Sequence, residues 1–291
     1  MGNNKHTVFN CIDMLPSSPG TALLHVIPAP YEKSVCYGKG TANGPSAILH
    51  ASHQLETFDG KSDPSDLGIF THPPVDCLGS HEFALKRIEK TVAEVLRIGK
   101  VPVMIGGEHT VTFGAIKALS VKFADFGVVQ FDAHADLRDS YQKSGYSHAC
   151  VLRRIHELGI PVFQMGVRSI CAEEHEYRKK KKIPYLDAEQ ICVKGIPGKI
   201  LPASFPKKIY LTFDIDALDP SVVPSTGTPV PGGLGWYQTM ELLENVLKGR
   251  KLLGMDLVEF SPVKTFHYPD YTAANLLYNI FGIAQRAKSL S

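Results

Sequence analysis

The sequence predicts a single α/β domain built on a mainly parallel sheet, and three observations support this prediction. The chain has 291 residues, of which 44% are hydrophobic and 21% are charged, as in ordinary soluble globular proteins. Short apolar runs alternate along it with helical patterns, which is typical of parallel strands connected by helices. No linker or shift in composition divides the chain, so we expect one domain.

Six apolar runs are predicted to be buried strands. Each is short, rich in β-favouring residues and bounded by Gly, Pro or polar residues, as expected of strands covered on both faces of a parallel sheet. The runs are residues 23–27, 101–105, 126–131, 162–167, 209–215 and 252–258.

Helical patterns lie between these runs. The clearest covers residues 81–99, where Ile88, Val92 and Val95 follow the three-to-four spacing of one helix face. Further helices are predicted near residues 44–56, 110–120, 148–158, 238–248 and 272–288. The basic run RKKKK at residues 178–182 follows a polar stretch, so we interpret it as a solvated helix end rather than a targeting or anion-binding patch.

Charge and cysteine content argue against several classes of partner and site. A formal charge of +2 gives no reason to expect a nucleic acid or a membrane as partner. The six cysteines are scattered, without the close pairs of a zinc site or the density of a disulfide scaffold. The first residues lack the apolar core of a signal peptide, and no stretch approaches a membrane span. We therefore expect a cytoplasmic protein with free thiols.

Acidic and histidine residues gather where three predicted strands end. The three motifs are Asp132-x-His134-x-Asp136, Asp214-x-Asp216 and Gly106-Gly107-Glu108-His109. Ligands of open α/β sheets bind outside the carboxyl ends of the strands, and residues two apart in an extended segment point to the same side. Although each motif alone is compatible with a turn or a helix cap, together they predict four aspartates and two histidines in one place.

The composition of this predicted cluster is that of a two-metal site. Buried carboxylates are unfavourable without a cation, and four of them carry too much charge for one divalent ion. Carboxylates with some imidazole and no thiolate suit Mn²⁺ better than structural Zn²⁺, although Co²⁺, Ni²⁺, Fe²⁺ or Zn²⁺ could bind. Two such ions lower the pKa of a water held between them, which favours hydrolysis at neutral pH. We therefore predict a hydrolase with two Mn²⁺ ions.

These motifs resemble those of the ureohydrolases, the family of arginases and agmatinases. The matching segments are GGEH (106–109), FDAHAD (131–136), SHA (147–149), FDIDALDPSVVPSTGTPVPGGL (213–234) and DLVEFSP (256–262). With residues 40–45, the resemblance spans nearly the whole chain after about residue 20. It implies a three-layer arginase-like fold around an eight-stranded parallel sheet. It also implies a catalytic domain at residues 21–291, preceded by an extension at residues 1–20 that is either a loose arm or a cover for a subunit interface.

The resemblance also assigns roles to individual residues. One metal would bind His109, Asp132, Asp136 and Asp214, and the other would bind Asp132, His134, Asp214 and Asp216. Glu259 would bind the substrate guanidinium, His148 would give a proton to the leaving amine, and Asp136 would accept a proton. Without the resemblance, a loop cap or salt bridge is the favoured role for Glu259, and a surface position is the favoured one for His148. Because family members usually form trimers or hexamers, a homo-oligomer is expected.

The substrate has to be chosen among small linear guanidines. Arginases hold the α-carboxylate with a Ser-Gly-Asn stretch just before the active-site histidine, whereas this chain has Tyr146 in place of the amide. Arginine is therefore disfavoured, and we expect hydrolysis of agmatine to putrescine and urea. The ammonium tail of agmatine prefers aromatic or acidic neighbours. The candidates are Tyr146, Glu32, Glu173 and Glu174.

Other functions remain open beside agmatine hydrolysis. Arginase and guanidinobutyrase belong to the same family, and the carboxylate of guanidinobutyrate would need a basic neighbour such as Lys33, Lys39 or Arg168. A phosphoesterase can also use two metals, but the sequence has neither a P-loop nor a cluster of arginines. The last alternative is a metal-binding scaffold without catalysis, although His148, Glu259 and all six predicted ligands are present.

Overall fold

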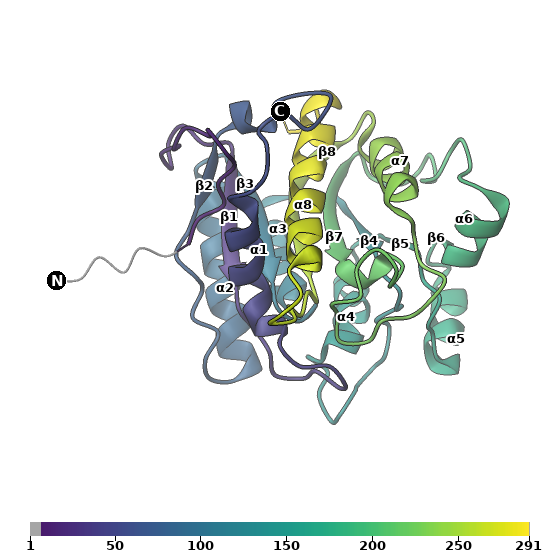
Figure 1. Ribbon diagram of the computed structural model, residues 1–291. Helices are drawn as coiled ribbons and strands as arrows, with labels where there is room; N and C mark the ends of the chain where they lie inside the picture. The colour runs from purple at the N-terminus through teal and green to yellow at the C-terminus, as the bar shows by residue number, and fades with distance from the viewer. Residues whose placement is uncertain (1–6, 291) are drawn as a thin grey trace.

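The computed structural model describes residues 7–290, in which eight parallel strands form one sheet between two layers of helices (Figure 1). In spatial order the strands are β2 (Ile69–Thr71), β1 (Leu24–Ala29), β3 (Val101–Gly106), β8 (Lys251–Val258), β7 (Lys208–Asp214), β4 (Gly127–Phe131), β5 (Val162–Met165) and β6 (Tyr185–Leu186). Every neighbouring pair is parallel. The predicted three-layer fold with an eight-stranded sheet is confirmed.

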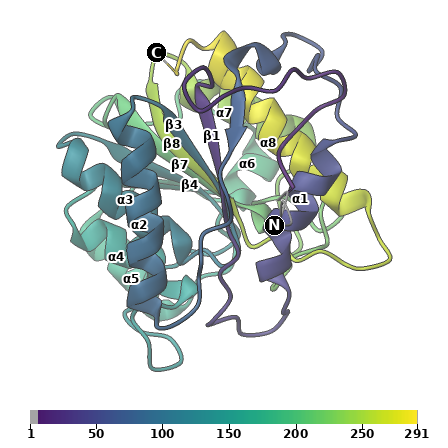
Figure 2. The same ribbon diagram turned by 90° about the vertical axis from the view of Figure 1, so that its left-hand side faces the viewer.

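The helices divide between the two faces of the sheet (Figure 2). One face carries α2 (His81–Arg97), α3 (Val111–Lys122), α4 (Val151–Glu157) and α5 (Ala172–Lys181). The other carries α1 (Gly44–Ser52), α6 (Ala188–Lys194), α7 (Trp236–Leu247) and α8 (Tyr268–Arg286). Short 3-10 helices lie at Thr41–Asn43, Pro64–Leu67, His148–Cys150 and Ile215–Ala217. Each layer buries its apolar side chains against the sheet, which gives two hydrophobic cores.

Helix α2 illustrates how the sequence specifies these elements. The hydroxyl of Ser80 accepts a hydrogen bond from the backbone N–H of Phe83 and so caps the first turn. Ile88, Val92 and Val95 are buried on the face toward the sheet, as their spacing predicts.

Several short elements escape prediction from the sequence. Strands β2 and β6 have three and two residues, and α6 has seven, which is too little for a periodic pattern. The apolar run 209–215 is a strand only as far as Asp214, because Ile215–Ala217 form a 3-10 turn.

The basic run is the end of α5, as predicted, with one exception. Lys179 to Lys182 are exposed, whereas Arg178 is buried and donates to both carboxylate oxygens of Asp187, at 2.9 and 2.7 Å. Such a paired ion contact satisfies the buried guanidinium.

The described part of the N-terminal extension packs against the domain. Phe9 and Cys11 are buried, and the ring of Phe9 lies 5.7 Å from that of Phe281 and 6.2 Å from that of Tyr278, both in α8. This part is therefore not a loose arm, and residues 1–6 lie outside the described residues. Within residues 7–290, no helix combines the length and the hydrophobicity needed to cross a membrane.

Candidate active site

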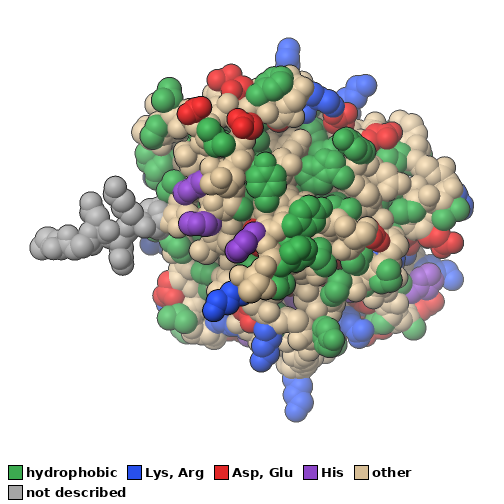
Figure 3. Space-filling model, in the orientation of Figure 1, with side chains coloured by type: hydrophobic (Ala, Val, Ile, Leu, Met, Phe, Trp, Pro, Cys, Tyr) green, Lys and Arg blue, Asp and Glu red, His purple; other side chains and the backbone are tan. Residues whose placement is uncertain are grey.

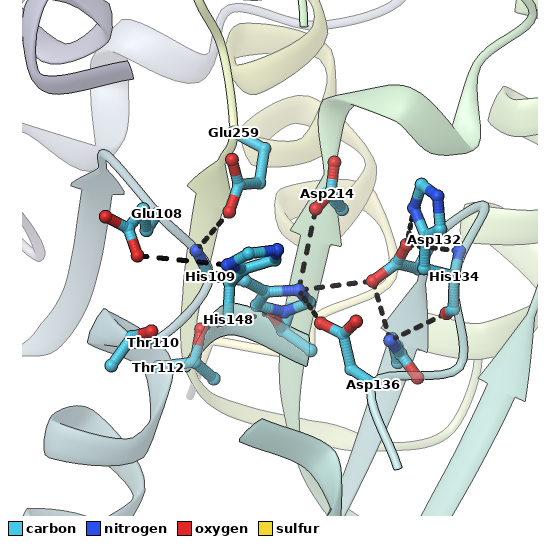
Figure 4. Close-up of polar contacts among 12 residues, drawn as sticks. Glu108, His109, Thr110, Thr112, Asp132, His134, Asp136, His148, Asp214 and Glu259 are labelled. Atoms are coloured by element: carbon cyan, nitrogen blue, oxygen red, sulfur yellow. Dashed lines mark hydrogen bonds and ion pairs between the residues drawn. The ribbon is translucent and has the colours of Figure 1, made fainter. Parts of the chain in front are cut away.

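The predicted metal-binding residues lie together at the carboxyl ends of the central strands (Figure 4). They lie at or just after the ends of β3, β7 and β4. Strand β8 lies between β3 and β7, and Glu259 directly follows its last residue. The six residues are His109, Asp132, His134, Asp136, Asp214 and Asp216. All are buried except His134, which is partly exposed. The sheet thus brings together side chains that lie more than 100 residues apart in the sequence.

Two groups of these side chains could each hold a metal ion. In the first, Nδ1 of His109 lies 3.1 Å from a carboxylate oxygen of Asp132 and 3.5 Å from one of Asp214. In the second, Nδ1 of His134 lies 3.0 Å from an oxygen of Asp216 and 3.7 Å from one of Asp132. Asp132 belongs to both groups, as a bridging ligand must, whereas bridging by Asp214 stays a prediction.

Backbone N–H groups orient the carboxylates. Asp132 accepts from the N–H of His134 at 2.6 Å, and Asp216 accepts from that of Ala133 at 3.0 Å. The extended geometry expected for both Asp motifs is wrong in detail. Asp136 has a positive φ of 53°, and Asp216 lies in the 3-10 turn after β7, where its N–H donates to Asp214 at 3.0 Å. Turns, rather than the alternation of a strand, therefore aim these side chains.

The electrostatics of the cluster fit a bound cation. Burial and the charges of neighbouring carboxylates, Asp216 first, raise the pKa of Asp214 well above its usual range. Burial opposes protonation of His134, yet Asp132 and Asp216 raise its pKa to about 12. Nδ1 of His109 is buried and has no hydrogen-bond partner among the described residues, although three carboxylate oxygens face it. Divalent ions would satisfy this nitrogen and neutralise the carboxylates.

Glu259 lies at the other side of His109 and faces the same cavity. One of its carboxylate oxygens accepts the backbone N–H of His109 at 2.7 Å. Burial raises the pKa of Glu259 well above its usual range, and the charges of Glu108 and Asp136 add to this effect. Its backbone has a positive φ of 60°, an uncommon conformation for a residue other than glycine, which is often found at functional sites. A bound guanidinium would provide the positive charge that stabilises the ionised form of this carboxylate.

His148 opens into the cavity from the 3-10 turn before α4. Its Nδ1 lies 3.4 Å from the hydroxyl of Ser34 and 4.0 Å from a carboxylate oxygen of Glu108. Burial and the positive charges of His109 and His134 lower the pKa of His148 to about 4. A neutral imidazole held in this way can accept a proton at neutral pH and pass it on.

Glu108 holds the loop after β1 in place through hydrogen bonds to Lys33 and Ser34. Its carboxylate is fully buried and accepts hydrogen bonds from the backbone N–H groups of Lys33 and Ser34 and from the Ser34 hydroxyl. The role of Ser34 could not be predicted from the sequence, because Glu108 lies 74 residues away in the chain.

The cluster opens into a cavity of about 130 Å³, which suits a small, slender substrate. Its lining includes Asp136, Asp214, Asp216, His134, His148 and Glu259. Loops 35–38 and 226–228 complete the wall. The two loops contact each other at Gly38 and Gly227, where the N–H of Gly38 donates to the carbonyl of Gly227 at 3.1 Å. A Cβ at position 38 would lie 2.8 Å from that carbonyl oxygen, which is too close. Glycine is therefore required at Gly38.

None of the residues expected to recognise the substrate tail lines this cavity. The ring of Tyr146 lies beside His81 and Phe113 instead. The candidate acids and bases form hydrogen bonds elsewhere. Backbone N–H groups donate to Glu32, Glu173 and Glu174. Lys33 donates to the carbonyls of Gly79 and Ser80, and Arg168 donates to backbone carbonyls that include those of Val230 and Asp216. Lys39 does not line the cavity either. The expectation that Tyr146 decides the substrate is not supported by its position.

Two further side chains, which were not predicted from the sequence, line the cavity wall. Arg138 and Tyr141 line the cavity, and the guanidinium carbon of Arg138 lies 5.1 Å from the centre of the Tyr141 ring. The signal was present in FDAHADLRD, since Arg138 follows the metal motif by two residues.

Comparisons with known proteins identify the family. Residues 22–282 match the model of the Arginase family. The chain is 36% identical over 276 residues to the N(1)-aminopropylagmatine ureohydrolase of Synechocystis sp., which covers 91% of this chain and 90% of that protein. It is 37% identical over 265 residues to the agmatinase of Pyrococcus horikoshii, with 90% and 92% covered. The crystal structure of the agmatine ureohydrolase of Thermoplasma volcanium matches with a TM-score of 0.86 and 29% identity, over 94% of both chains. The chain therefore belongs to the arginase family.

Proposed function

We propose that this arginase-family hydrolase cleaves the guanidinium group of agmatine, giving urea and putrescine. The observation that carries the proposal is the position of Glu259, whose buried carboxylate shares one cavity with the Asp and His cluster. A planar cation bound at Glu259 would present its carbon to the cluster, because both line the same cavity. The names of the similar agmatinase and N(1)-aminopropylagmatine ureohydrolase also favour an amine-tailed guanidine.

Two divalent ions, Mn²⁺ by our proposal, would bind among the clustered side chains and supply the Lewis acidity that makes water a nucleophile at neutral pH. Their ligands would be His109, Asp132, His134, Asp136, Asp214 and Asp216. The donors are oxygen and imidazole nitrogen without thiolate, which suits Mn²⁺.

The side chains of this chain bind the substrate and move the protons. Glu259 fixes the guanidinium by charge-assisted hydrogen bonds. Addition of water to its carbon releases a proton, which Asp136 accepts, and His148 relays this proton to the nitrogen of the departing amine as the C–N bond breaks. Both residues line the cavity, so neither transfer needs a large movement.

The test is urea release by Mn²⁺-loaded protein offered agmatine, N(1)-aminopropylagmatine, arginine, guanidinobutyrate and a generic phosphate ester. We expect the highest kcat/KM for agmatine. If no guanidine releases urea, the proposal is overturned, and a metal-binding scaffold without catalysis becomes the favoured function. Phosphate release would favour the phosphoesterase, and a preference for arginine would overturn the choice of substrate.

Guanidinobutyrate is the second candidate because of Arg138. This arginine lines the cavity, and its charge would suit a carboxylate tail better than an ammonium tail. Kinetics with agmatine and guanidinobutyrate side by side separate the two candidates directly.

We also propose a cytoplasmic homo-oligomer, either a trimer or a hexamer. Hydrophobic side chains gather on the face that Figure 3 shows, which carries α1 and α8. Exposed examples near the start of α8 are Phe266, Tyr268 and Tyr271. Exposed apolar clusters often mark interfaces between subunits. Light scattering coupled to size-exclusion chromatography would give the mass, and a monomer at micromolar concentration would contradict the proposal.

A further inference from the structure

A fully buried polar network lies in the sheet behind the candidate metal centre. Asp256 in β8 accepts hydrogen bonds from three hydroxyls: those of Thr212 at 2.6 Å, Tyr210 at 2.7 Å and Thr112 at 2.8 Å. None of these four side chains has measurable exposure to solvent. None of them lines the cavity, so they cannot contact the substrate.

Burial of this carboxylate needs a reason beyond stability. A charge in the middle of a parallel sheet is costly to desolvate, and apolar side chains of similar volume often give at least equal stability. The neighbouring positions in β8 are apolar, with Met255 and Leu257 both buried. Asp256 is therefore the one polar side chain in β8 after Lys251, and it lies opposite Thr212 in the neighbouring strand β7.

The directions of the hydrogen bonds connect Asp256 to the metal centre. A carboxylate accepts hydrogen bonds, so the single hydroxyl proton of Thr212 is donated to Asp256. The oxygen of Thr212 must then accept from Nε2 of His109, which lies 2.8 Å away. With its proton on Nε2, the neutral imidazole leaves a lone pair on Nδ1, the atom that faces Asp132, Asp136 and Asp214.

We propose that Asp256, acting through Thr212, is a positioning residue that fixes the tautomer and the ring orientation of His109 for metal binding. The proposal rests on the proposed function of the cluster as a metal centre. Hydrogen bonds to the second ring nitrogen of a metal-binding histidine generally increase its affinity by about 10- to 100-fold. In this chain the bond passes through a threonine hydroxyl.

The test compares two threonines that share the same acceptor. Thr212→Val removes the hydroxyl between Asp256 and His109, whereas Thr112→Val removes a hydroxyl that also donates to Asp256 but does not contact His109. Mn²⁺ binding to each metal-free protein is measured by calorimetry, and thermal unfolding checks that both variants are folded.

We expect Thr212→Val to weaken Mn²⁺ binding about 10- to 100-fold at one site, and Thr112→Val to leave it within about threefold. Thr212→Ser should restore the affinity, because it restores the hydroxyl. Equal affinities of folded Thr212→Val and the unaltered chain would overturn the proposal. Equal losses in the two valine variants would also overturn it, since they would indicate a packing effect.

Because the calorimetric comparison involves no substrate, failure to hydrolyse any guanidine would overturn the proposed function and leave this comparison intact.

Discussion

The two ends of the cavity are built differently. At the metal end, Asp132 and Asp214 stand at or directly after the ends of central strands and are buried, and backbone N–H groups hold their carboxylates. At the tail end, the wall consists of loops 35–38 and 226–228 with Arg138 and Tyr141. Side chains at strand ends share a rigid base, whereas loops can change without disturbing the sheet. We therefore expect the metal end to set the reaction and the tail end to set the substrate.

The largest effect is expected from Asp132→Asn at the metal end. Asp132 belongs to both metal groups, so losing its charge should cost a metal ion and lower urea release at least about a thousandfold. Activity and metal content by mass spectrometry are measured together. Asp139→Asn is the matched control, because Asp139 follows in the same segment but is exposed and pairs with Arg154. Normal turnover with both metals in Asp132→Asn would show that the cluster is not the reaction centre.

A smaller effect is expected from Glu259→Gln, which keeps the shape of the side chain but removes its charge. The amide oxygen can still accept the N–H of His109, so the fold should persist. Loss of the charge-assisted contact should lower kcat/KM about 100-fold, with metal content unchanged. Because burial and nearby carboxylates raise the pKa of Glu259, the metal-free variant should also unfold at a higher temperature than the unaltered chain. An unchanged kcat/KM would remove Glu259 from substrate binding.

At the tail end, Arg138→Ala should change the preference between substrates rather than the reaction. Removing this positive charge should favour an ammonium tail and disfavour a carboxylate tail, which shifts the ratio of kcat/KM for agmatine over guanidinobutyrate about tenfold. Mn²⁺ affinity should stay the same. Arg154→Ala is the control, because Arg154 pairs with Asp139 outside the cavity. If the ratio is unaffected, Arg138 does not contact the tail.

The smallest expected effect is a pH dependence of stability, which arises from His134 at the metal end. In metal-free protein the pKa of His134 is raised to about 12, so its protonated form stabilises the fold fully below the unfolded pKa of about 6.5. This contribution is lost progressively as the pH rises from about 6.5 toward 12. We expect the Tm of metal-free protein to fall by about 5 °C between pH 6.5 and 8.5, and the fall to be smaller with Mn²⁺ bound. A Tm that rises over this range would contradict the assignment, and Arg138→Ala should leave the fall unchanged.

The same contrast explains what the sequence could predict. Strand-end motifs such as Asp132-x-His134-x-Asp136 keep ligands adjacent in the chain, and the strands themselves have recognisable apolar runs. The sheet and the family, both predicted from those patterns, are confirmed, whereas the site remains a prediction whose residues the fold brings together. The turns that aim Asp136 and Asp216 were not predictable, since backbone dihedrals after a strand leave no pattern in composition.

Contacts between segments that are distant in the chain could not be predicted from the sequence either. The partnership of Ser34 with Glu108 and that of Thr212 with Asp256 each join different strands or loops. Tyr146 is predicted to neighbour the tail because it replaces the arginase amide two positions before His148, yet its ring lies beside that of His81. Proximity in the chain predicts little about which side of a loop faces a cavity.

The most direct test of a two-metal reaction centre is the number of ions bound when activity is complete. Metal-free protein is titrated with Mn²⁺ while bound metal and urea release from agmatine are followed in the same samples. We expect no urea before metal is added and maximal release at two ions per chain. Full activity at one ion per chain, or in metal-free protein, would contradict a centre in which Asp132 joins two ions.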